Sequence, residues 1–210
     1  MLHTIVPLAL ALTAAAPIPA ALSTLEHVAE AIDDAVVSQD WTKVRVLVRS
    51  GERALAELSI SSVLVGRDAI RALADAKSES HLRASLATRR AANRLAAAVV
   101  GMYEPLHPTV PTSVMRLDVL LREVALAAVA GNLPDARNAF GRAKAVWASI
   151  STGPPLAGSR AARTFSQQLA ALEHSIAAGL AQAVERRANA ALEGVDAIEK
   201  VFESTAHAAR

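Results

Sequence analysis

The feature that most constrains this chain is a helical spacing of apolar residues, sustained over most of its length. From Leu25, apolar side chains return at Val28 and Ile32, the spacing that places them on one face of an α-helix. Nearly a quarter of the residues are alanine, the best helix former, and only 3% are aromatic. Sheets would be richer in β-branched and aromatic residues. The sequence therefore predicts an all-α protein, an antiparallel helical bundle or stacked α-hairpins of about 6–8 helices.

Proline and glycine divide the helical stretches. Two proline-rich segments, 104–113 and 151–159, cannot be helical throughout and are predicted to be linkers. Around them we expect one helical domain, 21–210, composed of four α-hairpins at about 24–58, 61–103, 114–150 and 160–204. A break at 78–80 is expected to divide the second hairpin. The pattern leaves open whether 161–204 is one helix or a pair broken near Gly179.

A weak internal repeat accompanies the hairpins. Residues 25–58 align with residues 117–150, each 92 positions later (117 − 25), and this pairs Asp40 with Asn132. Both are preferred N-cap residues, so each is expected to begin the second helix of its hairpin. The last stretch aligns with the same unit, with Leu169 matching Leu117. Duplication of a hairpin and chance similarity between amphipathic hairpins both remain open.

The first twenty residues have the pattern of an export signal. An uncharged apolar run at 5–16 is followed by two prolines and small residues. We predict a signal peptide, 1–20, cleaved after Ala20. That cut would leave Ser23-x-x-Glu26 as a capping box at the start of the first helix.

This prediction implies a periplasmic or secreted protein, but two alternatives remain. The leading segment 1–3 lacks the lysine or arginine typical of such signals, so an uncleaved membrane anchor or an ordinary buried segment are the other interpretations. No later window approaches 18 uncharged apolar residues, and the mature chain is therefore not expected to span a membrane.

Composition excludes several classes of function. The chain has no cysteine, which excludes disulfides, thiolate metal sites and cysteine nucleophiles. Its formal net charge is +2, far from the strong basic excess of a dedicated nucleic-acid binder, and aromatic residues for base stacking are nearly absent. No nucleic-acid partner is expected.

One candidate metal site lies near the start of the first helix. His27 and Glu30 are one helical turn apart, as in the metal sites of helical bundles, and Asp34 extends the set. On a helical wheel these three side chains point away from the apolar face that contains Leu25. The competing interpretation is therefore a solvated polar face with no metal cofactor.

A basic stripe is the second candidate site. The expected fourth helix carries Arg89 and an edge formed by Arg83, Arg90 and Arg94, with no acidic residue between them. The first helix has the opposite character, with several acids and no lysine or arginine. The two faces either balance each other within the bundle or leave a surface for an anionic partner: lipid headgroups, a cell-wall polymer or an acidic protein.

No motif indicates catalysis. The chain has no recognisable serine–histidine–aspartate arrangement and no glycine-rich phosphate loop. We therefore expect an exported, non-catalytic helical protein, a binding, carrier or scaffold module for a protein or an anionic cell-envelope surface. The alternatives are a periplasmic metal-binding bundle and an enzyme of unrecognised type.

Overall fold

The computed structural model describes residues 18–58 and 63–208, and this part of the chain forms eight α-helices. These are α1 (Ala20–Val37), α2 (Trp41–Glu57), α3 (Val63–His81), α4 (Ser85–Tyr103), α5 (Thr112–Val129), α6 (Leu133–Ile150), α7 (Arg160–Ala177) and α8 (Ala181–Ala208), with a short 3-10 turn, η1 (Glu104–Leu106), after α4. The prediction of an all-α bundle of 6–8 helices is confirmed. None of the described helices is long and apolar enough to cross a membrane.

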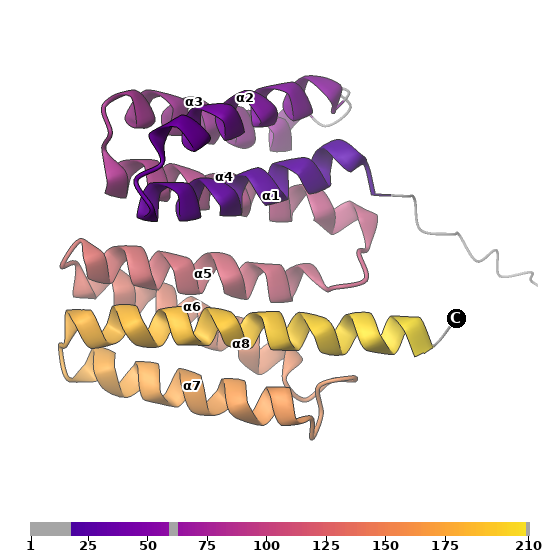
Figure 1. Ribbon diagram of the computed structural model, residues 1–210. Coiled ribbons are helices and arrows are strands. Elements are labelled where there is room, and N and C mark those ends of the chain that lie inside the picture. The colour runs from indigo at the N-terminus through magenta and orange to yellow at the C-terminus, as the bar shows by residue number, and fades with distance from the viewer. Residues whose placement is uncertain (1–17, 59–62, 209–210) are drawn as a thin grey trace, which may run out of the picture.

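The helices form two four-helix bundles, α1–α4 and α5–α8, which lie one above the other in Figure 1. In each bundle the first helix packs against the second and the fourth, and the third packs against the fourth. Each bundle encloses its own cluster of buried apolar side chains. The packing of α4 against α5 joins the two bundles.

The two bundles repeat one another along the chain. Helices α5 and α6 begin 92 residues after α1 and α2 (112 − 20 and 133 − 41), as the sequence alignment indicates. Helix α8 begins 96 residues after α4 (181 − 85) and occupies the same place in its bundle. The structural repeat is therefore a pair of hairpins, twice the unit that the sequence suggested.

Both predicted N-caps are confirmed. The Asp40 side chain accepts a hydrogen bond from the backbone N–H of Lys43 at 2.9 Å, and the Asn132 side chain accepts one from Asp135 at 3.2 Å. Each satisfies an N–H that the first turn of a helix leaves without a partner. The last stretch is a pair of helices, α7 and α8, with Gly179 in the turn between them.

The predicted capping box is wrong. Helix α1 begins at Ala20 after Pro19, so Ser23 and Glu26 lie inside the helix. Their side chains bond the hydroxyl of Tyr103 on α4 instead, at 3.4 and 2.7 Å. Of the predicted signal peptide, 1–17 lies outside the described residues, and the proposed cut would follow the first residue of α1.

The predicted break at 78–80 is also wrong. Helix α3 continues through these residues to His81. Ser80 is buried, and its hydroxyl donates to the carbonyl of Lys77 at 2.7 Å. This local bond satisfies the serine within a helix, so serine-rich sequence did not end α3.

The four turns inside the hairpins share one geometry, and all lie at the same end of the molecule, on the left in Figure 1. In each, the middle residue has a positive φ: 57° at Gln39, 52° at Arg83, 70° at Gly131 and 71° at Gly179. The next N–H donates to a carbonyl five residues earlier in each turn, which is the Schellman ending of a helix. Glycine adopts this conformation freely, whereas a residue with a Cβ is strained there.

We therefore expect Gln39→Gly and Arg83→Gly each to raise the free energy of unfolding by about 1 kcal/mol. Urea titration followed by circular dichroism measures this. The matched control is Gly131→Gln, which should lower the free energy by a similar amount. A Cβ at Gly131 would meet no atom within 4 Å, so any cost is that of the backbone. Unchanged midpoints in all three variants would contradict the argument.

Candidate functional site

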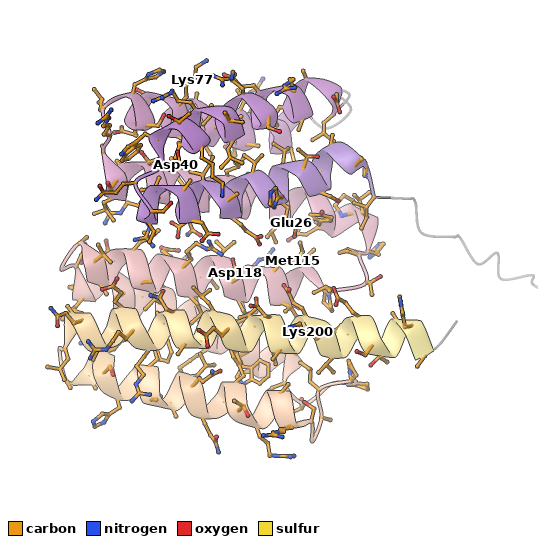
Figure 2. All side chains as sticks on the ribbon, in the orientation of Figure 1. Glu26, Asp40, Lys77, Met115, Asp118 and Lys200 are labelled. Carbon is orange, nitrogen blue, oxygen red and sulfur yellow. The ribbon has the colours of Figure 1, made fainter. Side chains whose placement is uncertain are left out.

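A cleft between the two bundles is lined by carboxylates, and we call it the interbundle cleft. Its acidic residues are Glu26 and Glu30 of α1, Asp118 of α5, and Asp196 and Glu199 of α8. The enclosed volume is only about 50 Å³. Figure 2 shows Glu26, Met115 and Asp118 together between α1 and α5. Both bundles thus contribute negative charge to one narrow space.

The repeat explains why the carboxylates meet. Glu26 and Asp118 are 92 residues apart and hold the same place on the first helix of each bundle. The bundles are closed on one side, where α4 packs on α5 and the Asn93 side chain donates to the carbonyl of Val119 at 3.1 Å. In the described structure α1 and α8 do not pack closely, so the cleft lies on the side where the acids gather.

Burial raises the pKa of two glutamates of the cleft, Glu199 and Glu30. It raises the pKa of Glu199 to about 7, with further increases from the charges of Asp118 and Asp196. Burial and the charge of Asp118 raise the pKa of Glu30 to about 6. Burial also raises the pKa of Tyr103 to about 12, so its hydroxyl stays protonated and donates to Glu26. Glu199 and Glu30 therefore change charge near neutral pH.

A short ion network lies beside the cleft. Arg89 of α4 donates to both carboxylate oxygens of Asp33 of α1, from Nε at 2.7 Å and Nη2 at 3.2 Å. Arg122 of α5 pairs with Asp118 at 3.0 Å, and its Nη1 lies 4.0 Å from Asp33. Asp33 is only 7% exposed. Its carboxylate lies between Arg89 of the first bundle and Arg122 of the second bundle.

The predicted metal residues do not come together. Glu30 lines the interbundle cleft, whereas His27 and Asp34 are exposed elsewhere on α1. Over 18–58 and 63–208, no three histidine or acidic side chains are grouped so that they could hold a metal ion. Instead of the other two predicted ligands, Glu30 has charged neighbours from the second bundle, among them Asp118 and Arg122 of α5.

The predicted basic edge divides into paired and unpaired arginines. Arg83 lies in the turn before α4 rather than on the helix. Arg94 pairs with Asp75 of α3 at 2.9 Å, as Arg89 does with Asp33. Of these two arginines only Arg89 balances the acidic face of α1, because the partner of Arg94 lies on α3. Arg83 and Arg90 are exposed and form no ion pair with any described residue.

Arg90 borders a groove between α4 and the α5–α6 hairpin, which we call the α4–α5 groove. Its volume is about 370 Å³. The lining residues are Arg90, Asn93, Arg94 and Ala97 of α4, Val119, Glu123, Leu126 and Ala127 of α5, and Asn132 and Asp135 at the start of α6. The acidic members already have partners, because Glu123 pairs with Arg142 at 2.6 Å and Asp135 bonds Asn132 at 2.6 Å.

The sequence indicates one side of the interbundle cleft and one side of the α4–α5 groove. The acidic face of α1 and the arginines of α4 are visible as charge patterns, but their opposite walls belong to α5 and α8, far along the chain. The 92-residue offset between Glu26 and Asp118 was the one sequence signal that relates the two sides of the cleft.

No family model, curated protein or solved structure matches the chain, so its function is argued from these two surfaces.

Proposed function

We propose that this chain is an exported, non-catalytic helical module that binds a protein partner through the α4–α5 groove. Arg90 carries the proposal: it is exposed at the groove and has no ion pair in the described structure, although Arg89 and Arg94 beside it are both paired. An exposed cation without a partner is available to an anionic group of a ligand. The apolar run at 5–16 supports export.

The surroundings of Arg90 favour a protein over a lipid surface or a charged polymer. The same groove holds Glu123 and Asp135, and Asp75 lies beside Arg94. These carboxylates are already partnered, and Arg94 is paired with Asp75, so a surface rich in phosphate would find one arginine of the groove, Arg90, without an ion pair in the described structure. A ligand with one anionic group and an apolar part fits this arrangement of charged and apolar side chains better.

The interbundle cleft is a poorer ligand site. Its volume of about 50 Å³ is far below the 300–1,000 Å³ typical of small-molecule pockets. Its carboxylates face each other and Arg122. We propose that the interbundle cleft has a structural role, in which its carboxylates couple the two bundles in a pH-dependent way.

Photo-crosslinking in the producing cell tests the proposal. A photoreactive amino acid at Ala97, exposed in the groove, should give a discrete protein adduct, whereas the same residue at the exposed Ala56 of α2 should not. Arg90→Glu should remove the adduct and weaken binding of the identified partner about tenfold, with a smaller effect at high salt.

Arg137→Glu is the matched control, because Arg137 is exposed on α6, lies outside the groove and forms no ion pair with any described residue. It should leave the adduct unchanged. Equal adducts from Ala97 and Ala56, or an adduct that survives Arg90→Glu, would refute the proposal.

A further inference from the structure

The geometry points to a specific ligand for the α4–α5 groove: the free C-terminus of a peptide. This inference rests on the proposed function, since it uses Arg90 as the anion-binding group. It adds the chemistry of the ligand, namely a carboxylate, the amide N–H next to it and one apolar side chain.

The Asn93 side chain supports this inference independently of Arg90. It lines the groove and is only 7% exposed. The amide nitrogen donates to the carbonyl of Val119 at 3.1 Å, while the amide oxygen has no hydrogen-bond partner among the described residues. A buried acceptor without a donor is destabilising and rare in native proteins, so it calls for an explanation. The groove therefore lacks one N–H or O–H donor.

The spacing along α4 matches the end of a peptide. Arg90, Asn93 and Ala97 are at positions i, i+3 and i+7, so they follow one another along the same face of the helix. A peptide C-terminus offers a carboxylate for Arg90 and an amide N–H for the Asn93 oxygen. Its last side chain then lies against Ala97 and the apolar wall of Leu126. A volume of about 370 Å³ accommodates a ligand of this size.

The other charges of the groove are already compensated. Arg94 pairs with Asp75, and Glu123 pairs with Arg142. Arg90 and the Asn93 oxygen are the groups that a ligand can still satisfy. The oxygen is covered in the free protein, so side chains at the groove must turn aside.

Nuclear magnetic resonance on the ¹⁵N-labelled chain tests the inference. The probes are acetyl-Gly-Ala-Leu with a free carboxylate and the same tripeptide as its C-terminal amide. The free acid should shift the Asn93 side-chain amide and the Ala97 backbone signal in a saturable way. The amide should bind at least tenfold more weakly, because Arg90 loses its anion.

Ala97→Trp should fill the groove and abolish the shifts without touching Arg90 or Asn93, and Ala56→Trp on α2 is the matched control with unchanged binding. Equal affinity for acid and amide, or unmoved Asn93 signals, would overturn the inference.

If Arg90→Glu removes the cellular adduct while the tripeptide leaves the Asn93 signals unmoved, this inference fails and the proposed function stands. If the tripeptide binds and the adduct survives Arg90→Glu, the proposed function fails.

Discussion

Asp33→Ala is expected to lower the free energy of unfolding by about 3–5 kcal/mol. The Asp33 carboxylate accepts two hydrogen bonds from Arg89 and lies 4.0 Å from Arg122, and all three side chains are largely buried. Removing it leaves two guanidinium groups in a poorly solvated place, and the nearby anions Asp118 and Glu30 both lie beside Arg122. The cost is mainly that of uncompensated buried charge rather than of lost attraction.

Tryptophan fluorescence during urea titration measures this effect in each bundle. Trp41 packs on the core of the first bundle, and Trp147 is buried in that of the second. Asp33 belongs to the first bundle, so the transition reported by Trp41 should move further than that reported by Trp147. Variants that keep only one tryptophan separate the two signals.

The matched control removes both charges. Asp33→Leu with Arg89→Met should recover most of the lost stability, because a buried ion pair replaced by apolar side chains of similar size costs little. Asp34→Ala, at an exposed neighbouring position, should change the free energy of unfolding by less than about 0.5 kcal/mol. A similar small change at Asp33 would mean that the network contributes little.

The sequence predicts the helices well because their determinants are local. The apolar spacing from Leu25, the caps at Asp40 and Asn132, and the glycine at Gly179 act within a turn or two of the chain. Where the local signals competed, prediction failed: Pro19 and the alanines after it begin α1 before Ser23, which then bonds α4 instead of capping its own helix.

The surfaces between the bundles were beyond sequence reasoning for a different reason. Glu26 and Glu30 lie away from the Leu25 face, and a helix in one bundle would show them to water. The second bundle lies against part of that face and brings Asp118 and Glu199 to it. Which hairpins meet depends on packing between segments about 90 residues apart, such as Glu26 and Asp118, and no single amphipathic pattern contains that information.

Raising the pH from 5 to 8 is expected to destabilise this protein through the interbundle cleft. The Glu199 carboxyl has an ordinary pKa of 4.5, and burial together with Asp118 and Asp196 raises its pKa to about 7 in the folded chain. Between these values the unfolded chain releases a proton that the folded chain retains. The free energy of unfolding therefore falls as pH rises, at up to about 1.4 kcal/mol per pH unit for one group, and is level above the folded pKa.

Glu199→Gln replaces the titrating carboxyl with a neutral amide. At pH 8 it should raise the free energy of unfolding by about 2 kcal/mol, after allowance for partial solvent screening, with almost no effect at pH 4.5. The raised pKa values of Glu30, Glu26 and Asp118 act in the same direction, so the variant should keep a shallower pH slope. Glu193→Gln, at an exposed position on the same helix, is the matched control. Urea titrations from pH 4.5 to 8 give the slopes. If both variants retain the slope of the parent chain, the cleft carboxyls do not couple stability to pH.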